Sequence, residues 1–326
     1  MSTALPFLEK HRPLLLDNII GQDHIITATK ELLRNIIEFP HILASGKPGI
    51  GKTTYAQALA RQIYGEDWED IVLEINASEE RKLETVRDKI LRYCQTAQTR
   101  HEVSRKMVIL EEFDSFLGQG QHALRRPMEQ YASSTIFVLT CNFPKKIIAP
   151  IRSRCAQFAF RTPKALDIEK YLKIVVEREE LAVESDALTL LAENAHGDFR
   201  PALLNLQCSI QTVNDKRIVT KDRVLEVGKF LTAESIGKIL ELVIAGKVEE
   251  ASAENEKYLM SGVSEETILK GLYEFVKSQK LFEDKKKGLP MLKEFVDASK
   301  NLGGSAIPEA VFDSLFIGVA NILGGK

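Results

Sequence analysis

Residues 41–64 read HILASGKPGIGKTTYAQALARQIY, and this stretch decides the fold. Its beginning, HILASG, is a short apolar run that ends in glycine, which is typical of a buried strand entering a tight turn. Its end, KTTYAQALARQIY, repeats apolar residues at helical spacing and stops before Gly65. The stretch therefore predicts a strand, a glycine-rich loop and a helix in direct succession.

The loop between the strand and the helix fits the phosphate-binding pattern G-x-x-x-x-G-K-[ST] as GKPGIGKT at 46–53. Glycines let the backbone turn tightly and aim its N–H groups at phosphate oxygens, and the helix N-terminus adds a favourable potential. We expect Lys52 to reach the β- and γ-phosphates and the Thr53 hydroxyl to hold Mg²⁺. The predicted nucleotide contacts of the loop are Gly46, Lys47, Pro48, Gly49, Ile50, Gly51, Lys52, Thr53 and Thr54.

Acidic residues follow another apolar run in the sequence MVILEEFD at 107–114. Chemistry on a bound triphosphate needs one carboxylate near Mg²⁺ and another that orients the attacking water. We assign Glu111 to the metal and Glu112 to the positioning and deprotonation of water. Taken alone, these residues would be interpreted as a solvated turn after a strand. The phosphate-binding loop earlier in the same predicted sheet favours the catalytic interpretation.

Short apolar runs alternate with amphipathic helical stretches up to residue 160. Four strands are predicted, over 41–46, 70–78, 106–114 and 135–142, with helices between them. Apolar strands that alternate with helices imply a parallel sheet covered on both faces. The helix predicted over 121–132 contains Pro127, which it can hold only near its start or with a kink.

The β-rich runs stop at the end of this region. Residues 164–229 are predicted to form short helices with joints at Gly197 and Pro201, and about five further helices follow. The predicted organisation is therefore an α/β domain over 1–163, a small helical domain over 164–229 and a larger helical domain over 230–326.

The composition is that of an ordinary soluble protein, with 326 residues, 44% hydrophobic, 28% charged and a formal net charge of −2. A near-neutral balance means that any surface for nucleic acid must be a local basic patch. The cysteines lie far apart, which argues against a zinc site built from close ligand pairs and against a disulfide scaffold. Charge comes too early for a signal peptide, and no apolar run reaches membrane-spanning length. We expect a soluble intracellular protein without a membrane partner.

Six short strings resemble one family of P-loop ATPases, the small subunits of replication factor C. LEKHRP at 8–13 is similar to the family's E-K-Y-R-P opening, and IGQ at 20–22 to its V-G-Q segment. The other strings are NASEER at 76–81 (N-A-S-D-E-R), ALRRPME at 123–129 (A-L-R-R-T-M-E), IRSRC at 151–155 (S-R-C) and GDFR at 197–200 (G-D-x-R). The resemblance implies an α/β P-loop ATPase domain of the AAA+ type with a parallel sheet, a small helical lid and an all-α collar at the C-terminus.

The resemblance also implies roles for residues outside the loop. Arg12 and Ile20 would lie near the adenine. Asn142 resembles the first sensor, a polar group near the attacking water, and Arg200 resembles the second sensor, which links the lid to the γ-phosphate of its own ATP. Arg154 resembles the arginine finger, which would enter the neighbouring subunit's site and stabilise charge on the transferred phosphoryl group.

Contacts with DNA are implied at three basic residues. Arg81 and Arg87 lie near the start of a predicted helix, and Lys146 lies in the segment NFPKKII. The resemblance places such side chains along the duplex backbone, so they would follow the shape of the helix and not its sequence. Without the resemblance, the same residues would be interpreted as a solvated helix face.

The implied function is that of an ATPase subunit of a sliding-clamp loader, which uses ATP and Mg²⁺ to open the clamp and load it on primer–template DNA. Its partners would be a large subunit, further small subunits in a five-membered ring, the clamp and the DNA. The compartment would be the cytoplasm in a prokaryote or the nucleus in a eukaryote. Head-to-tail contacts of this kind build open rings or spirals, not two-fold dimers.

Two other functions stay open. The chain has Glu111 where the family has Asp, and the added methylene displaces the carboxylate, which favours a subunit that binds nucleotide without hydrolysing it. Another AAA+ machine, such as a helicase loader or a branch-migration motor, is the third possibility, since fold does not fix function. Further departures from the family are Lys47, Phe113 and Pro127.

Overall fold

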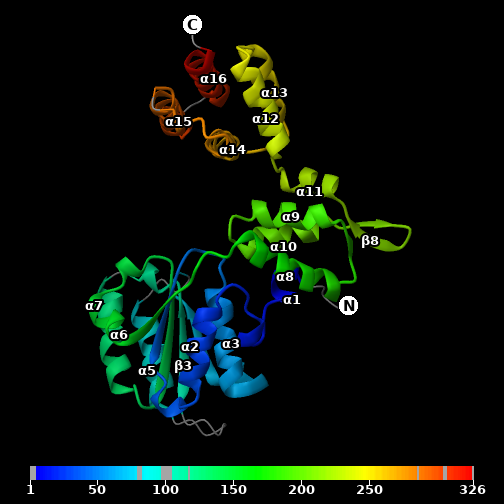
Figure 1. The fold of residues 1–326 in the computed structure, drawn as a ribbon. Coiled ribbons are helices and arrows are strands. Elements are labelled where there is room, and N and C mark those ends of the chain that lie inside the picture. Colours follow the sequence, from blue (N-terminus) through cyan, green and yellow to red (C-terminus); the bar gives the residue numbers. More distant parts are fainter. Residues whose placement is uncertain are drawn as a thin grey trace. The chain divides into compact units, whose positions relative to one another are not determined.

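The computed structural model describes residues 5–78, 83–96, 105–116, 118–284, 286–303 and 307–324. The chain forms two compact units, Met1–Thr220 and Lys221–Lys326. The first unit contains an α/β layer and a group of helices that follows it, and the second consists of helices (Figure 1). The finer division at 163 and 229 stays a prediction.

The sheet of the first unit has five parallel strands in the order β2-β3-β4-β1-β5. Their bounds are β1 (His41–Ser45), β2 (Val72–Asn76), β3 (Lys106–Glu111), β4 (Thr135–Cys141) and β5 (Cys155–Ala159). The predicted α/β class is confirmed. The sequence did not reveal β5, because this edge strand is only partly buried and lacks the apolar run of the others.

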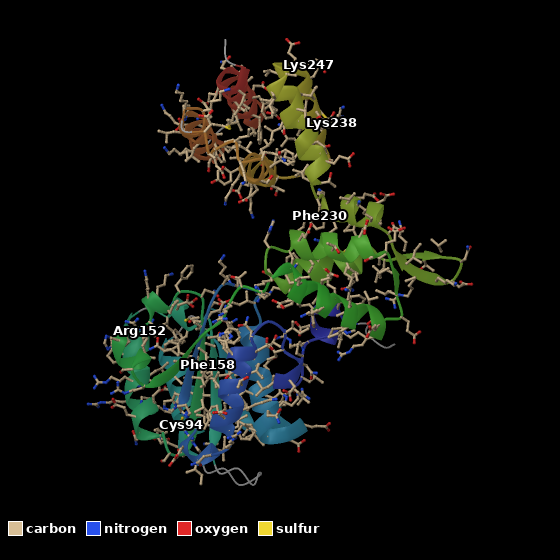
Figure 2. The ribbon with its side chains drawn as sticks, in the orientation of Figure 1. Cys94, Arg152, Phe158, Phe230, Lys238 and Lys247 are labelled. Carbon is tan, nitrogen blue, oxygen red and sulfur yellow. The ribbon has the colours of Figure 1, made fainter. Side chains whose placement is uncertain are left out.

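Helices cover both faces of the sheet, with α2 and α3 on one side and α5, α6 and α7 on the other (Figure 1). Alternate residues of a strand point to opposite faces, so Ile109 of β3 packs with the α3 layer, whereas Val108 packs with the α5 layer. The helices are α2 (Asp23–Leu33), α3 (Lys52–Tyr64), α4 (Trp68–Ile71), α5 (Leu83–Gln95), α6 (Gly118–Gln130) and α7 (Ala149–Arg152). Cys94 on α5, labelled in Figure 2, is buried in the core on that side of the sheet.

The first unit also contains several short elements. They are α1 (Phe7–Lys10), η1 (Leu16–Asn18), η2 (Ile36–Glu38), η3 (Gly65–Asp67), η4 (Phe113–Ser115) and η5 (Pro144–Lys146). Pro127 lies in the last turns of α6 and not near its start, and Tyr131 N–H donates to its carbonyl at 3.0 Å. Of the two predicted arrangements, a kink at Pro127 stays a prediction.

The group of helices after the sheet, residues 164–220, contains α8 (Ala165–Arg178), α9 (Ser185–Asn194) and α10 (Phe199–Cys208). We call it the lid. It also contains a small sheet in the order β6-β8-β7, with β6 (Ala182–Val183), β7 (Gln211–Val213) and β8 (Lys216–Val219). The expectation of helices alone was therefore wrong here. These strands are too short and too exposed to show a period of two in the sequence.

The second unit begins with α11 (Lys221–Gly228) and continues with α12 (Ala233–Ile244), α13 (Val248–Met260), α14 (Glu265–Ser278), α15 (Gly288–Leu302) and α16 (Pro308–Gly324). Five helices after residue 230 were predicted, and the described part of the chain has five. Buried residues such as Ile239, Leu272 and Phe316 form its own core. On the surface, Lys238 of α12, which Figure 2 labels, pairs with Glu254 of α13 at 2.8 Å.

Within the described ranges, no helix has both the length and the apolarity needed to cross a membrane. The same residues contain no group of three or more His, Cys, Asp or Glu side chains arranged to hold a metal ion.

Candidate nucleotide-binding site

The loop of residues 46–53 connects β1 to α3 at the carboxyl end of the sheet. Its glycines take backbone conformations that other residues avoid, with φ of +72° at Gly49 and +97° at Gly51. An added Cβ at Gly49 would lie 1.9 Å from Oδ1 of Asp198, and one at Gly46 would lie 2.6 Å from Cδ1 of Ile50. Glycine is therefore required at 46 and 49 for close packing as well as for the turn.

Lys52 begins α3 and is buried, with its ammonium group held by three acceptors. Nζ donates to the carbonyl oxygens of Gly46 and Lys47, both at 2.7 Å, and to Oδ1 of Asn142 at 2.8 Å. Burial lowers the pKa of Lys52 to about 8, and the positive charge of Arg200 acts in the same direction. The ammonium group thus lies at the mouth of the loop, where an anionic ligand would improve its environment.

Asn142 follows β4 and is fixed by an acid that the sequence analysis did not single out. Its backbone N–H donates to Oδ1 of Asp114 at 3.2 Å, and the N–H of Phe143 donates to Oδ2 of the same residue at 3.0 Å. Asp114 is the last residue of MVILEEFD, so it holds the end of β4 beside the end of β3. The side chain of Asn142 is therefore positioned from both its backbone and its contact with Lys52.

Glu111 and Glu112 end β3 at the same edge of the sheet. Glu112 has a left-handed backbone, with φ of +49°, and its N–H donates to Oγ1 of Thr140 at 3.3 Å. A residue other than glycine rarely adopts this conformation, and such strain is common at functional sites. The turn exposes the Glu112 side chain, whereas Glu111 is partly buried.

Glu111 lies among groups that suit a cation. Its Oε1 atom is buried and has no hydrogen-bond partner within the described part of the chain. Burial raises the pKa of Glu111 to about 7; the nearby carboxylate of Glu74 adds to the rise, and a hydrogen bond with Thr53 opposes it. Two close carboxylates and a hydroxyl form a donor set of hard oxygens, which is the set that Mg²⁺ prefers.

A chain of side chains leads from this acid pair to the N-terminal segment. Nε2 of Gln57 donates to Oε1 of Glu74 at 2.9 Å, and Nη1 of Arg12 donates to Oε1 of Gln57 at 3.2 Å. Arg12 also forms hydrogen bonds with the carboxylate of Glu9. The guanidinium group of Arg12 is thus tied to α3 and to α1.

Residues of the lid line the pocket on the side next to the loop. The N–H of Phe199 donates to the carbonyl oxygen of Gly49 at 3.2 Å, and the carboxylate of Asp198 caps α10 by accepting from the N–H of Arg200 at 2.8 Å. The motif GDFR at 197–200 therefore contacts the phosphate-binding loop directly. Arg200 is exposed and borders the pocket.

One pocket collects most of the residues that the sequence predicted. It is lined by Arg12, Ile20, Pro48, Gly49, Ile50, Gly51, Lys52, Thr53, Thr54, Glu111, Glu112, Asn142 and Arg200. Gly46 and Lys47 take part through their carbonyl oxygens on Lys52, and the Lys47 side chain is exposed. The loop, the acidic end of β3, the residues Asn142 and Arg200 and the N-terminal segment are thus brought to one place.

The pocket also contains residues that sequence reasoning missed. They are Leu8, Pro13, Ile19, Thr140, Cys141, Tyr171, Phe199 and Leu203. Leu8 and Pro13 belong to the string LEKHRP, so a signal for them existed. Tyr171 and Leu203 lie on lid helices at ordinary helical positions, and nothing in the sequence distinguishes them from core residues.

Arg154 lies away from this pocket, on the loop after α7. Its Nη1 donates to the carbonyl oxygen of Pro150 at 2.6 Å, and its Nη2 contacts the carboxylate of Glu129 on α6. About 30% of its side chain is exposed. Arg152, two residues earlier, ends α7 (Figure 2). Arg154 therefore does not contact the pocket of its own chain.

Of the three basic residues expected to bind DNA, the structure describes Arg87 and Lys146. Arg81 lies outside the described residues. Arg87 is exposed on α5, and Lys146 is exposed at the end of η5, with its Nζ 4.8 Å from the ring centre of Phe143. Phe143 is itself 59% exposed. An exposed aromatic ring next to a lysine could contact either bases or a protein surface.

Comparison with known proteins agrees with this geometry. Residues 42–162 match the family "ATPase family associated with various cellular activities (AAA)". The structure is similar to the Thermotoga maritima RuvB Holliday junction branch migration motor, with a TM-score of 0.54 and 18% identity over 82% of this chain and 91% of that one. Identity at that level shows a common fold alone.

Curated relatives identify the family more closely. The chain is 37% identical to the replication factor C small subunit of Methanothermobacter thermautotrophicus, over 82% of each chain. It is 37% identical to that of Thermofilum pendens, over 84% of this chain and 83% of the relative. For Methanococcus vannielii the identity is 35%, over 86% and 88%. The resemblance that the sequence motifs suggested is confirmed, and the chain belongs to the replication factor C small-subunit family.

Proposed function

We propose that this chain is an ATP-hydrolysing subunit of a sliding-clamp loader that acts at primer–template DNA. The observation that carries the proposal is the convergence on one pocket of a glycine loop with Lys52, the acid pair Glu111 and Glu112, and Asn142. Binding, metal coordination and activation of water need these three kinds of group together. The names of its curated relatives supply the clamp-loader context.

The phosphates would lie along the loop of residues 46–53. Its N–H groups at the start of α3 and the ammonium group of Lys52 offer hydrogen bonds and positive potential to the β- and γ-phosphates. The base would lie against the apolar side of the pocket formed by Ile19, Ile20 and Leu203. Arg12 reaches this side from the N-terminal segment, as the family motif implies.

The metal would be Mg²⁺, held by the Thr53 hydroxyl and the Glu111 carboxylate together with phosphate oxygens. The unpartnered Oε1 of Glu111 and the raised pKa of this residue fit a group that awaits a cation. When bound, Mg²⁺ would neutralise charge on the β- and γ-phosphates. Glu74 would add a second negative charge beside this position, which favours a cation there.

Hydrolysis would use Glu112 as the base. Its carboxylate would orient a water and accept a proton as the water oxygen attacks the γ-phosphorus, and the bond from the γ-phosphorus to the bridging oxygen of ADP would break. Asn142 would help to place the water. Lys52 and Arg200 would stabilise charge that develops on the phosphoryl oxygens.

Arg154 would act on the neighbouring subunit. In its own chain it faces away from the pocket and is paired with Glu129, so it is available at the surface of the α/β layer. A guanidinium group that enters a neighbour's site would make hydrolysis depend on assembly. The partners would be a large subunit, further small subunits, the clamp and DNA, in the cytoplasm of a prokaryote or the nucleus of a eukaryote.

The test is ATP turnover by the complex with its large subunit, measured with and without clamp and primed DNA. We expect low turnover for the free chain and stimulation by clamp and DNA together. Glu112→Gln should retain ATP binding and lower the turnover of its own site by at least about 100-fold. Arg154→Ala should lower turnover only in the assembled complex. Unchanged turnover of the complex with Glu112→Gln would instead show that this chain binds nucleotide without hydrolysing it.

A further inference from the structure

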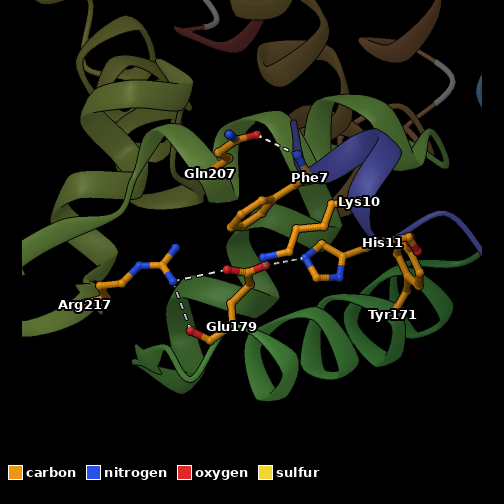
Figure 3. A network of polar contacts seen from close by, with 7 residues as sticks. All are labelled: Phe7, Lys10, His11, Tyr171, Glu179, Gln207 and Arg217. Atoms are coloured by element: carbon orange, nitrogen blue, oxygen red, sulfur yellow. Dashed lines mark hydrogen bonds and ion pairs between the residues drawn. The ribbon is translucent and has the colours of Figure 1, made fainter. Parts of the chain in front are cut away.

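Glu179, at the end of α8, has a buried carboxylate that contacts cationic groups from two separate segments (Figure 3). Its Oε1 contacts Nζ of Lys10 and lies 2.7 Å from Nε2 of His11, both in the N-terminal segment. Nη1 of Arg217 on β8 donates to its Oε2 and to its carbonyl oxygen, each at 3.1 Å. One lid residue thus joins α1, α8 and β8.

The carboxylate of Glu179 is ionised in this setting. Burial raises the pKa of Glu179, but hydrogen bonds from Lys10, Arg217 and His11 outweigh it and bring the pKa to about 2. An ionised carboxylate only accepts hydrogen bonds, so Nε2 of His11 carries a hydrogen and donates to it. The cluster is therefore organised around one negative charge.

Further contacts attach the N-terminal segment to the lid. The N–H of Phe7 donates to Oε1 of Gln207 on α10 at 3.0 Å, and the hydroxyl of Tyr171 on α8 donates to the carbonyl oxygen of His11 at 2.7 Å (Figure 3). The side chains of Phe7 and His11 are buried and meet edge to face, with ring centres 5.2 Å apart. Both ends of α1 are thereby bonded to lid helices.

The same segment forms one wall of the nucleotide pocket through Leu8, Arg12 and Pro13. A helix of four residues such as α1 has almost no stability of its own, because nucleation is unfavourable. Its position therefore depends on what it is bonded to. Tyr171 belongs to both sets, since it borders the pocket and bonds to His11.

We infer that Glu179 is a positioning residue for the nucleotide site: by binding Lys10 and His11 it attaches the segment 7–13 to the lid, so that this wall of the pocket moves with the lid. The inference rests on the proposed function of the pocket as an ATP site. Opening of the lid would then withdraw Leu8 from the nucleotide together with Arg200, and it would pull on the hydrogen bond that ties Arg12 to Gln57 of α3. Lid position and nucleotide affinity would be coupled through this carboxylate, together with the bonds of Phe7 to Gln207 and of His11 to Tyr171.

The first experiment compares Glu179→Gln with Glu193→Gln in the full chain. Glu193 lies on α9 of the same lid and is exposed, so it is a matched control for loss of one negative charge. Fluorescent mant-ATP with Mg²⁺ is the probe. We expect Glu179→Gln to weaken binding about tenfold, because Lys10, His11 and Arg217 lose the charge that holds them. Glu193→Gln should bind like the wild type.

Two further measurements distinguish a general loss of stability in Glu179→Gln from a changed position of residues 7–13. In the assembled complex, Glu179→Gln should raise KM for ATP by a similar factor and change kcat by less than about twofold, because the catalytic groups are untouched. Hydrogen exchange should become faster in peptides that cover residues 7–13 and stay unchanged in α3. A general loss of stability would raise exchange in both places.

A double variant tests the route through the N-terminal segment. If Glu179 acts through Lys10, the combination of Lys10→Gln with Glu179→Gln should weaken mant-ATP binding no more than Glu179→Gln alone. Should Glu179→Gln fail to fold, Gln207→Ala removes the bond to Phe7 N–H and should weaken binding in the same direction, by about two- to threefold.

The outcomes distinguish the two proposals. If the wild type does not bind mant-ATP, the proposed function fails. If the wild type binds and Glu179→Gln and Gln207→Ala bind equally well, the positioning role is overturned while the ATP site stands. Strictly additive effects of Lys10→Gln and Glu179→Gln would likewise contradict a shared route.

Discussion

Nζ of Lys52 lies 2.8 Å from Oδ1 of Asn142, so the side chain that would bind phosphate and the side chain that would place water are in direct contact. They come from different strands. Lys52 follows the loop after β1, and Asn142 follows β4, its neighbour in the sheet, where Ser45 is in register with Cys141. Parallel pairing of these two strands is what brings the residues together.

The contact predicts unequal effects for the two residues. Lys52→Ala should abolish measurable ATP binding, because the positive charge facing the phosphates is lost. Asn142→Ala should keep ATP affinity within about threefold and lower turnover about 100-fold, since only the placement of water suffers. Equilibrium binding and single-turnover hydrolysis measure the two properties. Loss of binding in Asn142→Ala would show that Asn142 mainly orients Lys52.

Gly49 and Gly65 form a matched pair for testing the contact between the loop and the lid. Both have positive φ, +72° and +76°, but an added methyl group meets Asp198 only at Gly49 and open space at Gly65. Gly65 has ψ of −149°, a conformation found almost only in glycine, so Gly65→Ala should lower stability by about 1–3 kcal/mol and leave ATP affinity unchanged. Gly49→Ala should also displace Asp198 and weaken ATP binding at least about tenfold. If Gly49→Ala and Gly65→Ala bound ATP equally well, the contact between the loop and Asp198 of the lid would not matter for binding.

Stability should depend on pH through Glu179. The pKa of this carboxyl is lowered to about 2 in the folded chain, from an ordinary value of 4.5, so the unfolded state binds the proton more tightly. The ionised group therefore stabilises the fold above about pH 4.5, and this contribution is lost as the pH falls from there towards 2. At pH 7 we expect Glu179→Gln to be less stable by about 1–3 kcal/mol.

Urea denaturation between pH 7 and pH 3.5 measures this effect. The difference in free energy of unfolding between wild type and Glu179→Gln should be largest at pH 7 and should narrow below about pH 4.5. Glu193→Gln gives the baseline for an exposed carboxylate. A difference that stays constant over the whole range would mean that the variant acts through packing and not through charge.

Binding of DNA should respond to salt through Arg87 and Lys146. Each is exposed, and each phosphate contact that is lost should weaken affinity for any duplex sequence and reduce the slope of log K against log salt by about 1. Arg34→Ala is the control, because Arg34 is 80% exposed and follows α2 on the opposite face of the sheet. An unchanged slope in Arg87→Ala or Lys146→Ala would remove that residue from the interface.

Local patterns predicted the parts of the site that depend on neighbouring residues. The strand, glycine loop and helix of residues 41–64 are contiguous, and their spacing indicates a phosphate site without any knowledge of the fold. Glu111 and Glu112 were predicted in the same way, because they directly follow the apolar run of β3. The family motifs added Asn142 and Arg200, which the structure places at the same pocket.

Contacts between distant parts of the chain could not be predicted. Glu179 lies 168 residues from His11, and no periodicity connects a lid glutamate with the N-terminus. In the sequence, Asp114 looks like part of an acidic turn. Its contact with the backbone of Asn142 follows only from the pairing of β4 with β3. The partly exposed strand β5 and the short strands of the lid lacked the apolar pattern that marks a buried strand.

One departure from the family now has a physical explanation. Phe113, where the family has a small residue, is fully buried and meets Phe116 edge to face, with ring centres 5.6 Å apart. It fills the core between the sheet and α5 and α6. The larger side chain therefore contributes to packing beside the acids and does not enter the pocket.

At Glu112, the residue that gives the most stable backbone and the residue that supplies the carboxylate are different. Glycine adopts φ of +49° without the steric penalty that glutamate bears there, so Glu112→Gly would relieve about 1 kcal/mol of local backbone strain. The same change would remove the carboxylate that we propose as the base, so turnover should be lost. Selection for thermal stability alone would therefore favour glycine at position 112. Selection for ATP turnover favours the glutamate carboxylate instead.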